Sequence, residues 1–141
     1  MKANWAKSWI GSIRPNKQRK FRFNAPLHIK QKFVSVHLSS ELRKKHGRRS
    51  VGVRTGDKVW VLRGQYKKKT GKVNKVELRR QRVYIDGIEN VRKEGTKSFV
   101  ALQPSNLMIV ELDLSDKKRK AKLAVEEVKK VSKKEKEQKN G

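Results

Sequence analysis

The chain has 141 residues, enough for one ordinary domain with extensions but not for two large domains. Apolar residues make up 34% of it, against roughly 45–50% in a typical globular protein, so the whole chain does not form one packed core. Its net charge is +26, and repulsion on that scale opposes compaction unless a polyanion supplies counter-charge. We therefore expect nucleic acid as the partner.

Several other classes of protein are disfavoured. Cysteine is absent, which excludes disulfides and thiolate metal sites and fits a reducing cytoplasm. No apolar run approaches the roughly 18–20 residues of a membrane span, and the N-terminus lacks the apolar segment of a secretory signal. His28, His37 and His46 have no ligand-like spacing, and Asp86 and Glu89 flank Gly87 as turn residues do. No Walker loop, nucleophile elbow or dinucleotide fingerprint is present. We expect a cytoplasmic protein that is not an enzyme, with no metal, cofactor, small-molecule substrate or membrane partner.

Residues 1–50 are predicted to form a basic N-terminal arm with two short helices. They carry 14 Lys and Arg against one acid, Glu41. In residues 1–24, Pro15 argues against a continuous helix. Trp5 and Trp9 are unusual in a solvated arm, and could dock on the protein's own core, on a neighbouring protein or on a base.

Capping residues mark the two predicted helices. The first begins near Asn24, a plausible N-cap, with Pro26 in its first turn. The second is capped by Ser39 and stopped by Gly47, with acidic and basic residues at the ends that suit the helix dipole. Neither helix has enough apolar surface to stand alone, so we expect both to lie on the β-domain or on the partner.

Residues 51–112 hold the only credible core. Five short apolar runs, with turn residues at each joint, favour a small antiparallel barrel over a parallel sheet, and the expected fold class is mainly β. The predicted strands lie at 59–62, 74–78, 83–85, 99–102 and 107–110. Val73 falls outside the alternation of 74–78 and indicates a bulge. Residues 113–141 form a lysine-rich tail with a weak helical face, which we expect to be helical or disordered.

The chain is organised around residues 55–73, where two apolar runs flank a loop of glycine and positive charge. Gly64 and Gly71 can take positive φ, so we expect them at the two ends of a tight strand-to-strand connection. Between and beside them lie Tyr66 and four lysines, Lys67, Lys68, Lys69 and Lys72. This pattern predicts a rigid cationic loop presented to phosphate.

Several separate motifs resemble one family. Gly56-Asp57-Lys58-Val59-Trp60-Val61, followed by Gly64, Lys67 and Gly71-Lys72-Val73, resembles the KOW motif of ribosomal proteins and transcription elongation factors. The flanking segments 19–28, 38–47 and 104–109 resemble the archaeal and eukaryotic branch of the universal large-subunit ribosomal protein twenty-four family. The match runs over roughly residues 17–114 in the same order.

The resemblance implies an SH3-like barrel, the KOW domain, bound to large-subunit rRNA and beside neighbouring large-subunit proteins. It further implies binding early in subunit assembly, near the 5′ part of that RNA and close to the exit of the peptide tunnel. Lys68 departs from the family, which usually has glycine after its loop lysine, so the resemblance implies a less tight and more cationic loop here.

Cations on structured elements are the predicted rRNA contacts, because Lys and Arg release condensed counterions and Arg presents a fork that suits phosphate. For Tyr66, stacking on a base and packing within the protein are about equally favoured. Phe23 is expected to pack within the protein. The predicted site comprises Arg14, Lys17, Arg19, Lys20, Arg22, Lys30, Lys32, Arg48, Arg49, Arg63, Tyr66, Lys67, Lys68, Lys69, Lys72, Arg79, Arg80 and Arg82.

Two other functions remain open at this point. A KOW module of a transcription elongation factor would need an additional α/β domain ahead of the KOW segment, and residues 1–50 are too short and too basic to supply one. A protein that compacts nucleic acid without sequence preference is allowed by composition alone.

Overall fold

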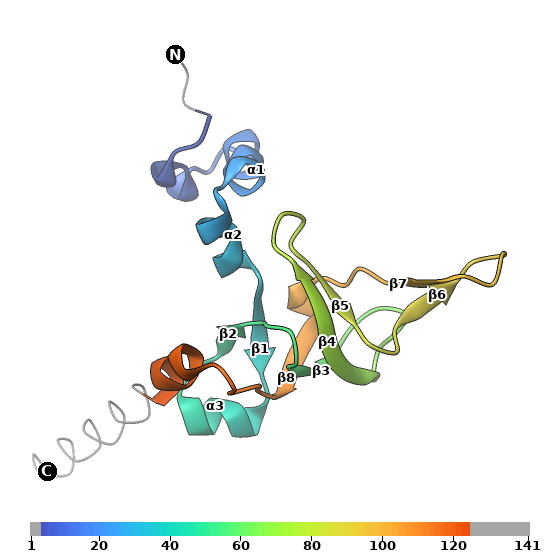
Figure 1. Cartoon of the computed structure of the whole chain (residues 1–141). Helices are drawn as coiled ribbons and strands as arrows, with labels where there is room; N and C mark the ends of the chain where they lie inside the picture. The colour runs from blue at the N-terminus through green and yellow to red at the C-terminus, as the bar shows by residue number, and fades with distance from the viewer. Residues whose placement is uncertain (1–3, 125–141) are drawn as a thin grey trace, which may run out of the picture.

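The computed structural model describes residues 4–124 (Figure 1). Its elements are η1 (Lys7–Gly11), α1 (Pro15–Asn24), α2 (Leu27–Phe33), β1 (Ser35–Leu38), α3 (Ser40–His46), β2 (Ser50–Gly52), β3 (Lys58–Val61), β4 (Thr70–Glu77), β5 (Arg82–Ile85), β6 (Glu89–Val91), β7 (Lys97–Phe99), η2 (Pro104–Asn106) and β8 (Leu107–Glu111). Residues 117–124 are also helical. The fold is therefore mixed α/β rather than mainly β.

Six strands form one sheet, in the order β2-β1-β8-β3-β4-β5, and β6 and β7 form a separate hairpin. Strands β1 and β8 run parallel, and the other neighbours in the sheet are antiparallel. Strands β2 and β5 stand at the two ends of this order, so the sheet is open. The closed SH3-like barrel is not confirmed.

Strands β1 and β2 were not expected: the residues of β1 were assigned to the arm, and those of β2 lie across the predicted boundary between the arm and the barrel. Along β1, Val36 and Leu38 are fully buried while Ser35 and His37 are half-buried, which is the alternation of a strand with one face on a core. This alternation is only four residues long, and helix-capping residues lie on both sides of it. The sequence therefore indicated helices here and not a strand. The predicted domain division after residue 50 falls inside β2.

The core is one cluster of buried side chains from the strands of the sheet and from the segments that connect them. Fully buried side chains come from β1, β3, β5 and β8, and Ile88 adds one from the turn before β6. Four of the five predicted strands are present as β3, β4, β5 and β8, with shifted ends. The fifth is displaced: Lys97–Phe99 is the strand, and Leu102 makes only an isolated bridge to Val83.

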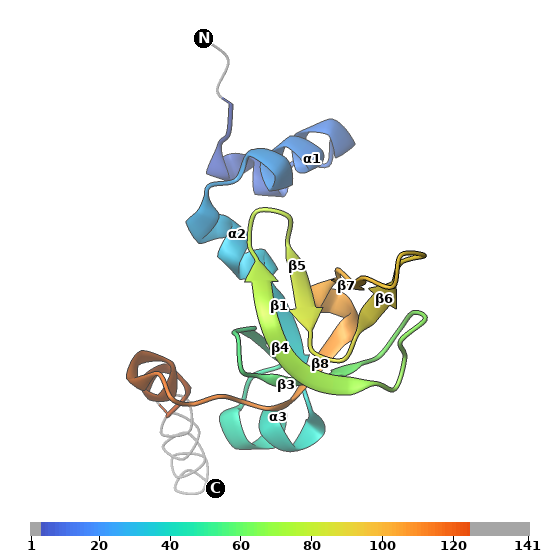
Figure 2. The same ribbon diagram turned by 45° about the vertical axis from the view of Figure 1, so that its right-hand side comes forward.

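The predicted bulge is present in β4. Val73 pairs with Ile85, and Val76 pairs with Val83, which leaves one extra residue on β4 between these pairs. The extra residue returns both valines to the face of the core. It also increases the twist of the β4–β5 hairpin, which reaches toward α2 (Figures 1 and 2).

The N-terminal segment has a small core of its own. The Trp5 ring stacks on Phe21 at a centroid distance of 5.5 Å, and Phe21 meets Phe33 edge to face at 5.9 Å. Trp5 Nε1 also donates to the Phe21 carbonyl oxygen at 3.0 Å. Of the three destinations considered for Trp5, the structure shows the first, packing on the protein itself.

The helix ends follow the capping residues, with one correction. Ser39 caps α3 through its side chain, which accepts from the Leu42 N–H, and Gly47 ends the helix with φ 69°. Pro15 is the first residue of α1 rather than a break in it, because a first-turn proline loses no helical hydrogen bond. Asn24 ends α1, and the N-cap of α2 is Pro26.

Within residues 4–124, no helix is long and apolar enough to cross a membrane.

Candidate nucleic-acid interface

Cations from two distant parts of the chain meet where the helical arm approaches the β4–β5 hairpin. The turn between β4 and β5 lies beside α1 and α2, and a cavity of about 740 Å³ opens between them. We call this cavity the notch. Its lining residues are Arg19, Lys20, Arg22, Phe23, Lys30, Arg79, Arg80, Gln81 and Arg82. Seven of these were predicted as rRNA contacts, and no acidic side chain lines the notch.

The turn at residues 78–81 directs its arginines into the notch. Gln81 has φ 56°, a left-handed conformation that lets the chain reverse within a few residues, and its N–H donates to the Leu78 carbonyl at 3.3 Å. The Gln81 side-chain oxygen accepts from Arg22 Nη2 at 3.5 Å, so one contact joins the arm to the hairpin. Arg80 also faces Glu77 at 3.5 Å on its own hairpin.

Phe23 lies at the notch with 81% of its surface exposed, so the expectation that it packs is wrong. The reason is helical periodicity: Phe21 is buried, and two residues along a helix turn the next side chain by about 200°. Lys30 Nζ lies 5.9 Å from the Phe23 ring centroid. An exposed aromatic ring among cations is the arrangement on which an unpaired base stacks.

The β3–β4 loop forms a second cationic group. It carries Arg63, Lys67, Lys68 and Lys69, all exposed, and Lys72 follows on β4. The loop is held by backbone hydrogen bonds. The Lys68 N–H donates to the Val61 carbonyl oxygen at 2.9 Å, and the Val61 N–H donates to the Lys69 carbonyl oxygen at 2.9 Å. The loop is therefore ordered, as a rigid cationic connection requires.

The two glycines of this loop have different tasks. Gly64 has φ 97°, as expected for one end of the connection. Gly71 does not have positive φ and lies inside β4, where it pairs with Val59. A Cβ there would stand 2.5 Å from the Asp86 carbonyl oxygen and 2.6 Å from Ile85 Cγ2, so glycine permits a close approach of two chain segments. The expectation that Gly71 supplies a left-handed turn is wrong.

Lys68 keeps the conformation that glycine would favour. Its φ is 72°, and the loop around it retains its backbone hydrogen bonds. That the loop is less tight than is usual in the family stays a prediction; the lysine itself adopts the left-handed conformation.

Tyr66 is half-buried and packs against the core. Its hydroxyl donates to the Asn90 side-chain oxygen on β6, and Lys69 Nζ lies 5.3 Å from its ring centroid. These contacts occupy both the ring and the hydroxyl. The tyrosine therefore positions Lys69 and ties the loop to β6.

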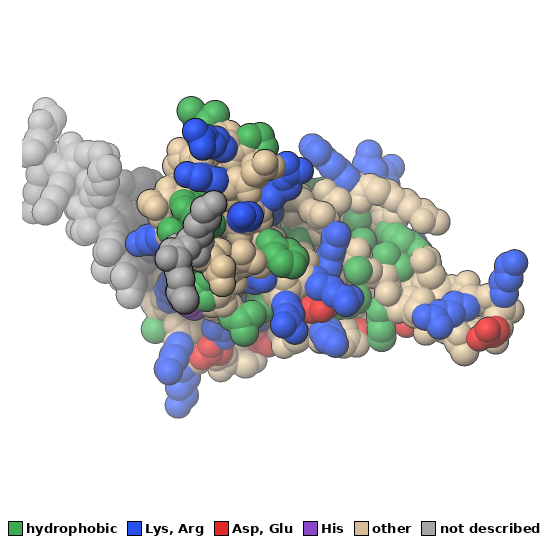
Figure 3. All heavy atoms as spheres, turned by 90° about the horizontal axis from the view of Figure 1, so that it is seen from above, with side chains coloured by type: hydrophobic (Ala, Val, Ile, Leu, Met, Phe, Trp, Pro, Cys, Tyr) green, Lys and Arg blue, Asp and Glu red, His purple; other side chains and the backbone are tan. Residues whose placement is uncertain are grey.

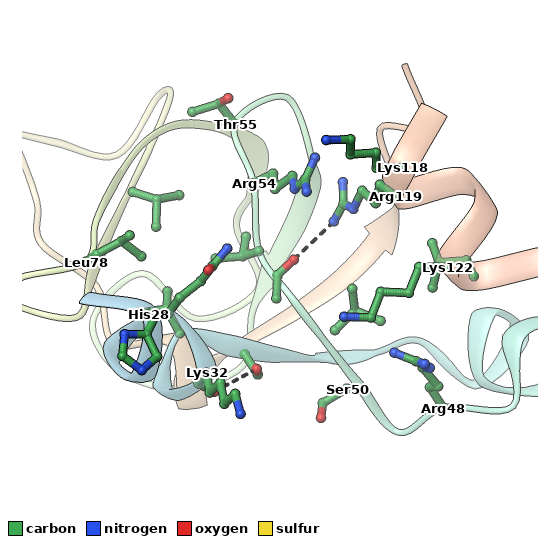
Figure 4. Close-up of a pocket in the computed structure, with 18 residues that line it drawn as sticks. His28, Lys32, Arg48, Ser50, Arg54, Thr55, Leu78, Lys118, Arg119 and Lys122 are labelled. Atoms are coloured by element: carbon green, nitrogen blue, oxygen red, sulfur yellow. Dashed lines mark hydrogen bonds between the residues drawn. The ribbon is translucent and has the colours of Figure 1, made fainter. Parts of the chain in front are cut away.

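The remaining predicted residues are dispersed. Arg14 is the N-cap of α1, Lys17 lies on α1, and Arg49 precedes β2, all with exposed side chains. Lys32 and Arg48 line a different cavity, which also involves the helix at residues 117–124 (Figure 4). Viewed from above, cations are scattered over the whole visible face, with few acids among them (Figure 3).

The sequence interpretation missed a buried ion pair. Arg119 Nη1 and Nη2 donate to the two carboxylate oxygens of Asp57 at 2.6 and 2.7 Å, and both residues are buried. Arg119 also donates to the carbonyls of Gly52 and Asp113. Asp57 in turn accepts from the N–H groups of Arg54 and Asp113. The pair fastens the helix at 117–124 to the start of β3.

A signal for this pair exists in the sequence. Arg119 is the single arginine among the eleven basic residues of 113–141. Arginine is preferred over lysine in buried, bidentate pairs, so an isolated arginine in a lysine tail indicates a specific partner.

A second pair lies beside the first. Arg54 Nη1 donates to the Asp116 carboxylate, and this hydrogen bond lowers the pKa of Asp116 below its usual value. The Lys118 N–H donates to the other oxygen of the same carboxylate at 2.9 Å, which also caps the helix. Among residues 4–124, no three His, Asp or Glu side chains are grouped so as to hold a metal ion.

Comparison with known proteins gives the class and then the family. The family model for the eukaryotic ribosomal proteins L26 and their archaeal counterparts matches residues 12–126. The large ribosomal subunit protein uL24 of Methanosarcina barkeri is 45% identical over 108 residues, which is 77% of this chain and 93% of the relative. These matches place the chain among the structural proteins of the ribosome.

More particularly, the chain belongs to the uL24 family, in its archaeal and eukaryotic type. The resemblance drawn from the sequence is confirmed. The chain is a structural constituent of the large ribosomal subunit, its location is the cytoplasm, and its family is one of ribosomal structural proteins rather than of enzymes.

Proposed function

We propose that the chain binds large-subunit rRNA through the notch, and that the β3–β4 loop extends this contact. The observation that carries the proposal is the convergence of cations from α1, α2 and the β4–β5 hairpin on one cavity without an acidic lining residue. Phosphate contacts supply much of the affinity of basic proteins for RNA, and Phe23 offers a stacking surface within the same notch.

Its place in assembly follows from the family resemblance. Binding occurs early, near the 5′ part of the rRNA and close to the exit of the peptide tunnel, beside neighbouring large-subunit proteins. A chain of net charge +26 is suited to an early step, because it neutralises phosphate before the RNA compacts.

We further propose that the sheet is a variant of the SH3-like arrangement. The antiparallel strands β3, β4, β5 and β8 support this, as does the bridge from Leu102 back to Val83 on β5. The folded unit then runs from β1 to β8. Residues before β1 are the arm, and residues from 113 onward are the tail.

Competition binding tests the proposal. The full chain is titrated with large-subunit rRNA and, separately, with random duplex DNA at moderate salt. We expect the rRNA to compete far more strongly. Comparable affinity for the two would contradict the proposal and favour a protein that compacts nucleic acid without preference.

A matched pair of variants locates the contact. Arg19→Ala with Arg79→Ala removes two cations of the notch, whereas Lys44→Ala with Lys45→Ala removes two exposed cations from α3, at the opposite end of the molecule (Figure 2). The first variant should lower the log–log salt slope of rRNA binding by about 1.4–1.8, at roughly 0.7–0.9 per lost phosphate contact. The α3 variant should leave the slope near that of the unmodified protein. Equal slopes in both variants would show that the notch is not the contact.

A further inference from the structure

A second cavity, separate from the notch, lies where α2, the strand β2 and the helix at residues 117–124 come together (Figure 4). Its volume is about 690 Å³, within the usual range of small-molecule sites. Four segments distant in sequence contribute to its lining, so it exists only in the folded chain. We call it the tail pocket.

The polar lining of the tail pocket is entirely cationic or neutral. Its basic and imidazole side chains are His28, Lys32, Arg48, Arg54, Lys118, Arg119 and Lys122, and no Asp or Glu side chain lines it. Arg54 is paired with Asp116, and Arg119 is paired with Asp57. Lys32, Lys118 and Lys122 are exposed and form no ion pair within the described part of the chain.

Arg119 is the buried cationic member of this lining. The residue is 5% exposed, and its Nε is buried without a hydrogen-bond partner among residues 4–124, although both Nη atoms are satisfied. Because this Nε has almost no accessible surface, a molecule in the pocket would meet the lysines rather than this atom.

The other part of the lining is apolar. Val51, Val76 and Leu78 are half-buried around the pocket, and Leu123 contributes from the helix at 117–124. Inorganic phosphate alone would leave such a wall in contact with water. A phosphate that carries a base satisfies both halves of the lining, because the base covers the apolar wall while the phosphate meets the lysines.

We propose that the tail pocket binds a single unpaired nucleotide of RNA, with its phosphate beside Lys122, which lies between Lys118 and Lys32 (Figure 4), and its base against Val51, Val76 and Leu78. This inference rests on the proposed RNA-binding function, and it adds a specific pocket to the general phosphate contacts. RNA loops and bulges present such unstacked nucleotides, whereas duplex RNA does not.

The test follows the methyl resonances of the full chain by NMR during titration with uridine monophosphate, with uridine and with inorganic phosphate. Uridine monophosphate should shift the methyl signals of Val51, Leu78 and Leu123 saturably, and it should bind more tightly than either of its parts. Equal binding of inorganic phosphate, or shifts absent from these methyl groups, would overturn the proposal.

Variants on one helix provide the control. Lys118→Ala with Lys122→Ala removes two lining lysines, and Lys117→Ala with Lys120→Ala removes two exposed lysines of the same helix that do not line the pocket. The first should weaken uridine monophosphate binding about tenfold or more, and the second less than about twofold. Equal weakening in both variants would mean that the attraction is only general charge.

Two further arms separate the outcomes. A short single-stranded oligoribonucleotide should bind the pocket more tightly than uridine monophosphate, and the reverse order would assign the pocket to a free nucleotide and overturn the RNA proposal. Binding of large-subunit rRNA to the unmodified chain is measured in the same buffer. If the chain binds rRNA but the methyl signals of the pocket do not shift, the tail pocket alone is refuted. If the chain does not prefer rRNA, the proposed function is refuted.

Discussion

Lys68 holds a backbone conformation that an L-residue adopts at a cost. At φ 72° its Cβ is crowded by the backbone, which costs roughly 1–2 kcal/mol relative to the right-handed region. The side chain is exposed and contributes one more cation to the β3–β4 loop. We infer that the chain exchanges some stability of the loop for positive charge on its exposed surface.

Lys68→Gly should therefore stabilise the protein. The glycine relieves the left-handed strain but is more flexible when unfolded, so the net gain in the free energy of unfolding should be about 0.5–1 kcal/mol. Urea unfolding of the full chain measures it. Lys67→Gly is the control, since Lys67 lacks positive φ and loses the same charge. A Lys68→Gly protein no more stable than the control would contradict the strain argument.

Gly71→Ala should destabilise the protein for a steric reason. The added Cβ would meet the Asp86 carbonyl, a backbone atom that cannot swing aside, at 2.5 Å. Overpacking of this kind costs about 1–3 kcal/mol, and thermal unfolding would report it as a lower Tm. Gly52→Ala is the comparison, because nothing lies within 4 Å of a Cβ at that position. If both variants melted together, the close approach at Gly71 would not limit stability.

The helix at residues 117–124 depends on one interaction. Its sequence is rich in lysine and offers little apolar surface, with Leu123 as its main buried hydrophobic side chain. The Arg119–Asp57 pair compensates, since four donors converge on a carboxylate that is fully buried. The helix is held to the sheet by this specific pair more than by a hydrophobic face.

Arg119→Met should lower the free energy of unfolding by about 3–5 kcal/mol, because it leaves the Asp57 carboxylate buried without its counter-charge. Lys120→Met removes the same charge from an exposed neighbour and should change stability by no more than about 0.5 kcal/mol. Urea unfolding compares the two. Similar midpoints would show that Asp57 regains water when Arg119 is lost, and that the pair orients the helix without stabilising the sheet.

The elements that the sequence predicted well are those with a local signal. Strands β3, β5 and β8 follow from short apolar runs, and α3 follows from Ser39 and Gly47 at its ends. Strand β6 has no such signal: Glu89 and Asn90 are polar, and the strand forms because it pairs with β7. The Arg119–Asp57 pair joins residues far apart in sequence, so the lone arginine among lysines indicates that Arg119 has a partner but does not identify Asp57.

In the candidate site, too, the local features were predictable from the sequence and the spatial grouping was not. Cation density predicted which residues are available, and every predicted site residue is at least partly exposed. The grouping was not predictable, because the notch requires α1 and the β4–β5 hairpin to meet in space. Phe23 was misjudged because its exposure depends on which face of α1 packs against Trp5 and Phe33.

The helical arm and the sheet differ in how firmly each is held in the folded molecule. The arm rests on a small aromatic cluster and one long hydrogen bond to the hairpin, whereas the sheet encloses a continuous core. Local opening costs least where few apolar side chains are buried. The arm should therefore open more readily than the sheet in the free protein.

Amide hydrogen exchange of the free chain measures this difference. Exchange should be slowest for the amides of the sheet strands β1, β3, β4, β5 and β8. It should be faster for the amides of η1 and α1, because local opening of the arm exposes them without unfolding the sheet. Addition of large-subunit rRNA should slow exchange in α1. Slow exchange in residues 4–20 without RNA, equal to that of β3, would contradict the proposed arm.

The parallel pairing of β1 with β8 has a consequence for the newly made chain. His37 lies opposite Met108, so about 70 residues must be synthesised between the two partners before they can meet. Until β8 has left the ribosome, the edges of β1 and β3 that it will join stay unpaired, and such edges invite wrong pairing. Abundant lysine and arginine around them is then a safeguard during synthesis, because like charge keeps two unfinished chains apart.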